Sequence, residues 1–251
     1  MDVAAYLKRI GLEGPITADI ETLRILQRAH LGTVPFENLS IHLGEPIVLD
    51  EQALYGKIIE RNRGGFCYEL NGAFAALLTA LGYRVGLLSA RVNGGGHIGP
   101  PLDHMPLRVD LAEPWLVDVG FGRFAHHPLR LDVRDDQPDP EGVFRLVEHD
   151  DDVDVLLDGE LQFRVDPRNY VLRDFAPTCW WQQTSPDSHF THSLTCSVLT
   201  ETGRVTLSGD RLIETTNGQR VERVLTEPEQ LTAYQEHFGI TLDRPPTVQP
   251  R

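Results

Sequence analysis

The sequence predicts an α+β fold, with helices first, strands in the middle and a mixed end. Through the first third of the chain, apolar residues recur at the spacing of an amphipathic helix. From about Arg84 onward they alternate with polar residues or form short apolar runs between Gly, Pro and Asp turns, which is typical of strands. Because the two patterns are segregated along the chain, a parallel sheet of βαβ units is not expected.

Three helices are expected in the first third, at residues 19–32, 50–62 and 66–83. Thr17 or Asp19 can cap the first and Asp50 the second, because their side-chain oxygens can accept hydrogen bonds from the free amides of a first helical turn. The third segment has the clearest apolar stripe, and Gly82 is placed to end it. A further helix is expected at residues 227–239.

The expected strands share an alternating or continuous apolar character. They cover residues 84–92, 104–111, 114–121, 141–149, 152–159, 161–167, 192–201, 204–209 and 211–218. Between the first two, the glycine-rich segment 94–103 is expected to form a mobile loop.

The composition argues against several classes of protein. The chain has 251 residues, 41% of them hydrophobic, and no apolar run of the length that a membrane span needs. Charged residues interrupt the N-terminal segment, which makes it a poor secretory signal. A net charge of −14 would repel nucleic acid. We therefore expect a cytoplasmic globular protein with neither a membrane nor nucleic acid as a partner.

The chain has three cysteines, Cys67, Cys179 and Cys196. Their odd number and wide spacing suit neither a disulfide framework nor a thiolate zinc site, so no metal is expected. Cys179 and Cys196 lack a helix start or flanking positive charge and are interpreted as packing residues.

Cys67 is the candidate nucleophile. It follows two glycines at residues 64–65, where the third helix is expected to begin. The free amides and the dipole of a helix N-terminus favour a thiolate and could hold an oxyanion, and Arg61 and Arg63 add positive charge nearby. The alternative is that Cys67 is a small buried hydrophobic residue, as most free cysteines are.

A cysteine nucleophile needs a base, and the base needs a group that orients it. His104 opens a strand, whereas His97 lies within the glycine-rich segment, and spacing alone does not choose between them. Asp118 lies in an apolar strand, where an unpaired carboxylate would be costly. If residues 104–111 and 114–121 pair as a hairpin, His104 and Asp118 come close together. The alternative is a structural aspartate bonded to backbone amides.

The segments RGGFCYELNG, DHMPL and WLVDVGFG, in this order, resemble the nucleophile, histidine and aspartate motifs of the arylamine N-acetyltransferases. Cys67 and His104 are 37 positions apart, and His104 and Asp118 are 14 apart, which agrees with that family. LQRAHLGTVPFENLSIHLG near the start and EHFGI near the end extend the resemblance over nearly the whole chain.

The resemblance implies a helical bundle that carries the nucleophile, a β-barrel that carries His and Asp, and an α/β lid, with a papain-like Cys-His-Asp core. These three parts would cover residues 1–84, 85–186 and 187–251. It also implies a ping-pong reaction in which acetyl-CoA, as co-substrate, acetylates Cys67. An arylamine, arylhydrazine or N-hydroxyarylamine then accepts the acetyl group. His104 would move the protons and Asp118 would orient it, with no metal required.

Residue by residue, the resemblance implies a substrate-binding set of Phe36, Val92, Phe121, Gly122 and Phe190. Phe121 and Phe190 would bracket the aromatic ring of the acceptor, unless they are ordinary core residues. Arg63 and Glu37 would form an ion pair that supports the active-site loop.

One residue departs from the family pattern. Asp103 stands where the family often has Thr or another uncharged or basic residue. A carboxylate there would lie near the incoming CoA or raise the pKa of His104. We therefore predict weaker acetyl-CoA binding, which the KM of Asp103→Thr for acetyl-CoA would test.

Two other functions remain open at this point. Amide synthases that release ansamycin polyketides resemble the same family and act on a carrier-bound acyl chain, so the motifs do not separate them. A non-enzymatic binder of CoA or another small molecule is the second alternative. The preferred amine and the oligomeric state are not predicted.

Overall fold

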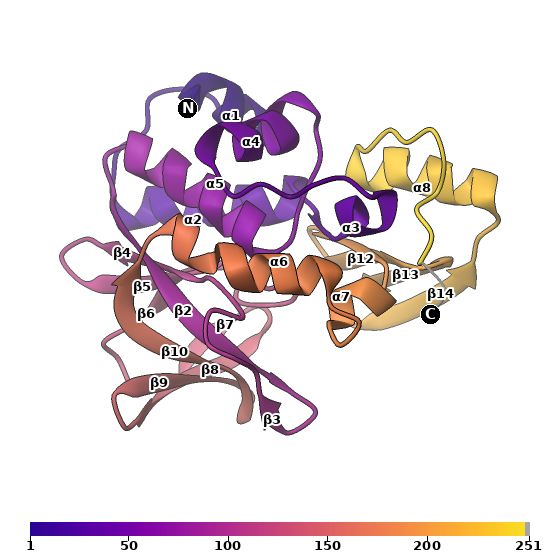
Figure 1. Ribbon diagram of the computed structural model, residues 1–251. Coiled ribbons are helices and arrows are strands. Elements are labelled where there is room, and N and C mark those ends of the chain that lie inside the picture. The colour runs from indigo at the N-terminus through magenta and orange to yellow at the C-terminus, as the bar shows by residue number, and fades with distance from the viewer. Residues whose placement is uncertain (249–251) are drawn as a thin grey trace.

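The computed structural model describes residues 1–248, which form a helical N-terminal segment, a curled nine-stranded sheet and a separate five-stranded sheet (Figure 1). The N-terminal segment contains α1 (Val3–Arg9), α2 (Ile20–Thr33), α3 (Leu39–Leu43), α4 (Glu51–Tyr55) and α5 (Cys67–Ala80). Asp19 caps α2 and Asp50 caps α4, each carboxylate accepting a backbone hydrogen bond of 2.8 Å. Of the two candidate caps for α2, the side chain that binds is therefore Asp19.

The second expected helix is not continuous. α4 ends at Tyr55, and Gly56–Glu60 form a π-helical turn. Lys57 in this turn is buried, and its Nζ lies 2.6 Å from Oε1 of Glu69 on α5. Because this contact joins residues of two different helices, the local apolar pattern could not predict the change of helix type.

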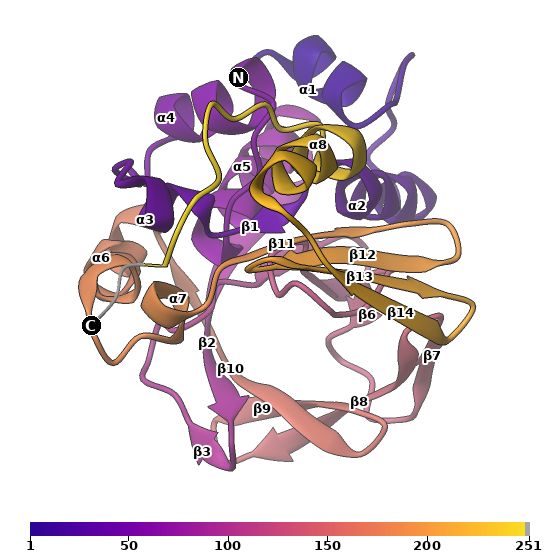
Figure 2. The same cartoon turned by 90° about the vertical axis from the view of Figure 1, so that its right-hand side faces the viewer.

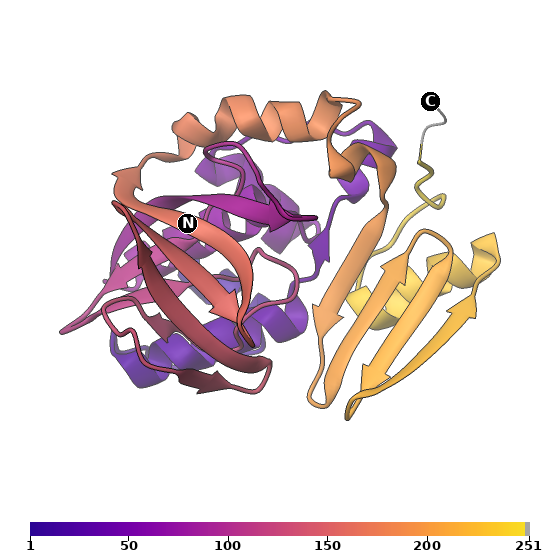
Figure 3. The ribbon, with the colours of Figure 1, turned by 90° about the horizontal axis from the view of Figure 1, so that it is seen from below.

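The nine-stranded sheet is curled into a nearly closed barrel, which Figure 3 views from below. Its strands are β2 (Arg84–Gly94), β3 (His97–Ile98), β4 (Leu107–Asp110), β5 (Pro114–Val117), β6 (Leu129–Arg130), β7 (Gln137–Asp139), β8 (Gly142–His149), β9 (Asp152–Leu157) and β10 (Glu160–Tyr170). The order is β6-β5-β4-β2-β10-β9-β8-β7, with β3 paired to β2. The side chain of Gln137 bonds both the N–H and the C=O of Arg130, at 2.7 and 3.0 Å, and so links the edge strands β7 and β6.

The hairpin expected between residues 104–111 and 114–121 is present as the pairing of β4 with β5. Leu107 lies opposite Val117, and Val109 lies opposite Trp115. His104 lies just before β4, where it exchanges two backbone hydrogen bonds with Ala90 of β2. The backbone of His104 is therefore tied to the centre of the sheet.

The five-stranded sheet draws on both ends of the chain. β1 (Phe36–Glu37) is its first strand, followed by β11 (Thr195–Leu199), β12 (Gly203–Ser208), β13 (Arg211–Thr216) and β14 (Gln219–Val224). Glu37 lies opposite Cys196 in the β1–β11 pair. The last helix, α8 (Glu227–Phe238), packs its buried Tyr234 and Phe238 into the core of this sheet (Figure 2).

Two helices connect the barrel to the five-stranded sheet. After a 3₁₀ turn at Leu172–Phe175 come α6 (Ala176–Thr184) and α7 (His189–His192), which lie along one side of the molecule (Figures 1 and 3). The sequence analysis predicted no element at the helices α1, α3, α6 and α7 or at the strands β1, β3, β6, β7 and β14. These segments are short, or largely exposed like β14, so their apolar periodicity is weak. Within residues 1–248, none of the helices combines the length and the apolar character that a bilayer span requires.

Candidate active site

Cys67 is the first residue of α5 and is buried, with 4% of its surface exposed. The two preceding glycines are required by close contacts. A Cβ on Gly64 would lie 1.9 Å from the carbonyl oxygen of Pro35, and one on Gly65 would lie 2.7 Å from the Glu69 side chain. The loop can therefore press against β1 and the start of α5 only if both positions lack a side chain.

A buried group of charges holds the same loop from behind. Arg63 donates to Oε1 of Glu37 at 3.0 Å and to Oε2 of Glu45 at 3.2 Å. Oε2 of Glu69 accepts a hydrogen bond of 3.2 Å from the backbone amide of Phe66, the N-cap of α5, while its other oxygen binds Lys57. Removing one partner of such a group would leave a buried charge uncompensated. The geometry of the Arg63–Glu37 pair is the one that the resemblance implied.

His104 and Asp118 are in direct contact. Nε2 of His104 lies 2.6 Å from Oδ2 of Asp118, and both residues are buried. The other carboxylate oxygen of Asp118 accepts from the side chain of Asn71 at 2.9 Å and from the amide of Gly120 at 2.8 Å. The partner of Asp118 is thus an imidazole as well as a backbone amide. His97, the other candidate base, lies exposed on β3.

Asn71 is a member of this group that the sequence analysis did not identify. It lies four residues after Cys67 on α5, donates to Asp118 and accepts from the amide of Val119 at 2.9 Å. A Cβ on Gly120 would lie 2.7 Å from the Cα of Cys67, so this glycine lets the two segments touch. The available signal was a polar residue, Asn71, on the buried and mainly apolar face of α5, where a polar group needs a partner.

Cys67 and His104 open into one cavity of about 410 Å³. Its walls are built from Phe36, Cys67, Val92, Gly94, Pro100, Asp103, His104, Gly120, Phe121, Trp181, Gln182, His189 and Phe190. The walls are mainly aromatic and aliphatic, with few polar groups, as is typical of a site for a flat apolar ligand.

Four of the five expected substrate-binding residues line this cavity, namely Phe36, Val92, Phe121 and Phe190. Gly122 does not line it. A Cβ on Gly122 would lie 3.7 Å from the nearest ring atoms of Phe36, so Gly122 packs against that ring. Its φ of +91° is one that favours glycine. The ring of Phe121 packs edge-on against His104 at a centroid distance of 5.1 Å.

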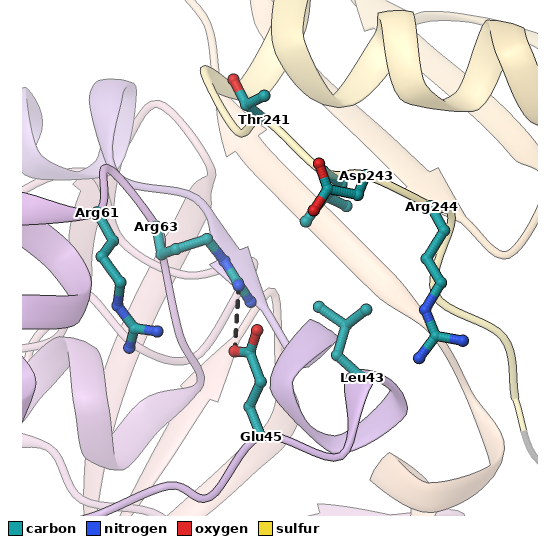
Figure 4. A pocket seen from close by; sticks show the side chains of 8 residues that line it. Leu43, Glu45, Arg61, Arg63, Thr241, Asp243 and Arg244 are labelled. Carbon is teal, nitrogen blue, oxygen red and sulfur yellow. Dashed lines mark hydrogen bonds and ion pairs between the residues drawn. The ribbon is translucent and has the colours of Figure 1, made fainter.

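The environment of the thiol differs from the one that the sequence suggested. Burial raises the pKa of Cys67 well above its ordinary range, and the Asp103 carboxylate raises it further. Arg61 and Arg63 do not offset this effect. Arg63 binds the buried Glu37 and the partly exposed Glu45, and Arg61 lines a cavity separate from that of the thiol (Figure 4). The expectation that the two arginines stabilise a thiolate is therefore wrong.

The remaining local support for a thiolate is the start of α5. The amide of Tyr68 lowers the pKa of Cys67, although burial outweighs it. Deprotonation of the thiol then depends on a base in the cavity. Asp118 occupies Nε2 of His104, which leaves Nδ1 as the nitrogen that can exchange a proton with a group in the cavity. Such a site can carry out acyl transfer through cysteine.

The other two cysteines lie in the core. Cys179 is buried on α6, where its sulfur accepts from Gln183 at 3.3 Å, and Cys196 is buried on β11. Within residues 1–248, no group of three His, Cys, Asp or Glu side chains is arranged to hold a metal ion.

Comparisons with known proteins agree with this geometry. The sequence model of a family described as N-acetyltransferase matches residues 19–247. The arylamine N-acetyltransferase of Mycolicibacterium smegmatis is 36% identical over 257 residues, which cover 96% of this chain and 93% of that protein. The protein of the same name from Escherichia coli strain K12 is 36% identical over 248 residues, covering 95% of this chain and 88% of that protein. The solved structure of Mycobacterium marinum arylamine N-acetyltransferase in complex with CoA is similar at a TM-score of 0.87 and 30% identity, covering 95% of this chain and 93% of that one.

Proposed function

This chain belongs to the arylamine N-acetyltransferase family, and on that premise we propose that it transfers an acetyl group from acetyl-CoA to aromatic acceptors through Cys67. The acceptors are arylamines, arylhydrazines or N-hydroxyarylamines. The observation that carries the proposal is that Cys67 and His104 line the same aromatic-walled cavity and that His104 is hydrogen-bonded to Asp118.

The first half-reaction acetylates the enzyme. His104 accepts the thiol proton, and the Cys67 sulfur attacks the thioester carbonyl of acetyl-CoA. The negative charge on Asp118 stabilises the imidazolium that forms. The tetrahedral intermediate collapses by expelling the CoA thiolate, which takes the proton from His104. We propose that backbone amides at the start of α5, where Cys67 is the first residue, stabilise the developing oxyanion.

The second half-reaction releases the product. The amine attacks the acetyl-Cys67 carbonyl and passes a proton to His104. When the intermediate collapses, the Cys67 sulfur leaves and recovers that proton. Phe121 and Phe190 are proposed to bracket the ring of the acceptor, since both line the cavity beside the thiol.

The phosphates of CoA need a positive site, because the chain has a net charge of −14. A cleft of about 760 Å³ between the barrel and the five-stranded sheet supplies one, with Arg123, Arg204 and Arg220 in its walls. Burial is the main cause that lowers the pKa of Arg204; Glu141 opposes it, and Arg123 and Arg28 lower the pKa further. The walls of the cleft hold three arginines against two glutamates, Glu141 and Glu201. Positive charge is therefore in excess here, and Arg123 follows directly after Phe121 and Gly122. We propose that this cleft binds the nucleotide end of acetyl-CoA.

A phosphate-free donor tests the cleft. In Arg204→Gln, we expect the KM for acetyl-CoA to rise about tenfold, because a charge-assisted contact to phosphate is lost. The KM for S-acetyl-N-acetylcysteamine, which has no phosphate, should stay unchanged. Arg61→Gln, in the other arginine-lined cavity, is the matched control. Equal changes with both donors would contradict the assignment of the cleft.

The main test measures thiol release from acetyl-CoA, with and without an aromatic hydrazine, in wild type and Cys67→Ala. Amine-dependent release that disappears in the variant is the expected result. Acylation by thioesters without any response to free amines would support the amide-synthase alternative. If no acylation occurs, the protein is a binder and the assignment of Cys67 fails.

A cytoplasmic location is part of the proposal. It is supported by the three thiols, Cys67, Cys179 and Cys196, which are all free and buried. A reducing compartment suits a reactive cysteine of this kind.

A further inference from the structure

The cavity beside Cys67 contains one acidic side chain. Among the residues that line it, Asp103 is the only carboxylate, and neither lysine nor arginine is present. The remaining walls are mostly aromatic or aliphatic. A carboxylate in such surroundings acts on a bound ligand over several ångströms, because apolar walls screen a charge less than water does.

The backbone around Asp103 is held in an unusual conformation. Leu102 has a φ of +64°, which a branched side chain rarely adopts. Its amide donates to Oγ of Ser89 at 2.9 Å. The hydroxyl of the buried Tyr68 lies 2.9 Å from the carbonyl oxygen of Leu102 and 3.0 Å from that of Asp103. Residues from β2 and α5 therefore fix the position of Asp103.

The carboxylate of Asp103 is bound by a neutral partner. Nε2 of Gln182 on α6 donates to Oδ1 at 2.6 Å, and Oγ of Ser188 in turn donates to Oε1 of Gln182 at 2.6 Å. Within residues 1–248, no lysine or arginine forms an ion pair with Asp103. The amide of Gln182 orients the carboxylate without cancelling its charge.

We propose that Asp103 is a specificity-determining residue that selects the acetyl acceptor by charge. It favours neutral and cationic aromatic amines and hydrazines over arylamines that carry a carboxylate on the ring. This inference rests on the proposed function.

The negative charge of Asp103 should affect the binding of the aromatic acceptor more than the binding of acetyl-CoA. The part of acetyl-CoA that reaches Cys67 is a neutral thioester, while its phosphates are proposed to lie in the separate arginine-lined cleft. A ring substituent on the acceptor stays inside the cavity with Asp103. The weaker acetyl-CoA binding predicted from the sequence remains a prediction, and we expect it to be the smaller effect.

Two acceptors of matched shape test the proposal, namely 4-aminobenzoate and its neutral analogue 4-aminobenzamide. The carboxylate withdraws electrons less than the carboxamide does, so the anion is the better intrinsic nucleophile. Wild type should nevertheless have the higher kcat/KM for the amide. Asp103→Asn keeps the size of the side chain and an oxygen for Gln182, and it should raise the ratio of benzoate to benzamide kcat/KM about tenfold.

The ratio cancels any change that affects both acceptors, such as an altered thiol. Asp187→Asn is the matched control, because this exposed aspartate lies just outside the cavity between α6 and α7. We expect its ratio to equal that of wild type. An unchanged ratio in Asp103→Asn, or a wild-type preference for the benzoate, would overturn the proposal. The wild-type preference alone decides the matter if Asp103→Asn does not fold.

Failure of this inference differs from failure of the proposed function. Acetylation of 4-aminobenzamide that requires Cys67, together with an unchanged ratio, would leave the enzyme an acetyltransferase without charge selection. The absence of any acetylation of either compound would reject both proposals.

Discussion

The two sides of the loop at residues 61–67 differ in their chemistry. On one side, Arg61 and Arg63 line a cavity of about 520 Å³ with Glu45, Asp243 and Arg244 (Figure 4). On the other side, the Cys67 thiol opens into a mainly aromatic cavity.

Arginines four and six residues away from Cys67 in the sequence can thus be directed away from the thiol. The charged side holds the loop in place, because Arg63 is paired with the buried Glu37 and with Glu45. The aromatic side keeps the thiol protonated until His104 accepts its proton, since burial raises the pKa of Cys67. The charged side of the loop therefore fixes its conformation, and the aromatic side provides the environment in which the Cys67 thiol reacts.

Among the predictions that test this division between the two sides, Asp118→Asn should have the largest effect, a loss of acetylation rate. Asparagine cannot supply the negative charge that stabilises an imidazolium on His104, and the raised pKa of Cys67 makes that charge essential. We expect the rate of acetylation by acetyl-CoA to fall about 10³–10⁴-fold, measured as single-turnover thiol release. A fall below tenfold would show that the thiol does not need the His104–Asp118 pair.

Arg63→Met should destabilise the protein by disrupting the ion pairs on the charged side of the loop. It removes the cation of Glu45 and the hydrogen-bonded cation of Glu37, which is fully buried and keeps only Lys57, with its Nζ 4.0 Å from Oε1. We expect the free energy of unfolding, measured by urea titration, to fall by about 3–5 kcal/mol. The matched control is Arg61→Met, which removes an exposed arginine and should change stability by less than about 0.5 kcal/mol. Equal losses in the two variants would contradict the division of roles.

On the aromatic side of the loop, Asp103→Asn tests how a nearby charge affects the Cys67 thiol. The negative charge of Asp103 raises the pKa of the Cys67 thiol, so its removal should lower that pKa. The rate of alkylation by iodoacetamide as a function of pH should then have its midpoint at lower pH than in wild type. Asp187→Asn should leave the midpoint where it is. An unchanged midpoint would show that Asp103 does not act on the thiol, and a midpoint at higher pH would contradict the sign of its effect.

The smallest effect is expected from Phe121→Leu. The ring of Phe121 packs against His104 and Phe163 as well as lining the cavity, so leucine keeps part of the packing. Losing one aromatic contact to the acceptor should raise its KM about threefold to tenfold, with little change in the KM for acetyl-CoA. Equal changes for both substrates would assign Phe121 to packing alone.

The starts of α2, α4, α5 and α8 and the positions of the longer barrel strands were predicted within a few residues, because both depend on near neighbours. The Asp19 and Asp50 caps and the hairpin of β4 with β5 follow from periodicity and turn residues. The π-helical turn at Gly56–Glu60 did not, since it accompanies a contact between Lys57 and the remote Glu69.

The candidate site was predicted in part. The order of the three motifs identified Cys67, His104 and Asp118 as one set, but local spacing did not separate His104 from His97. Asn71 was missed because its partners, Asp118 and Val119, are distant in the sequence. The Arg63–Glu37 pair was expected, but the effect of Arg61 and Arg63 on the thiol was mistaken, because Arg63 binds Glu37 and Glu45 instead.

By itself the sequence determined the α+β order of elements, the position of Cys67 at a helix start and the family. These features depend on residues that are close together along the chain, where the helical or strand periodicity determines which neighbours share a face. Only the tertiary structure decided that His104 contacts Asp118, that β1 completes the sheet of β11–β14, and that an arginine-lined cleft lies beside the barrel. Such contacts join residues far apart in the chain, and the packing of whole elements selects them among many alternatives of similar local character.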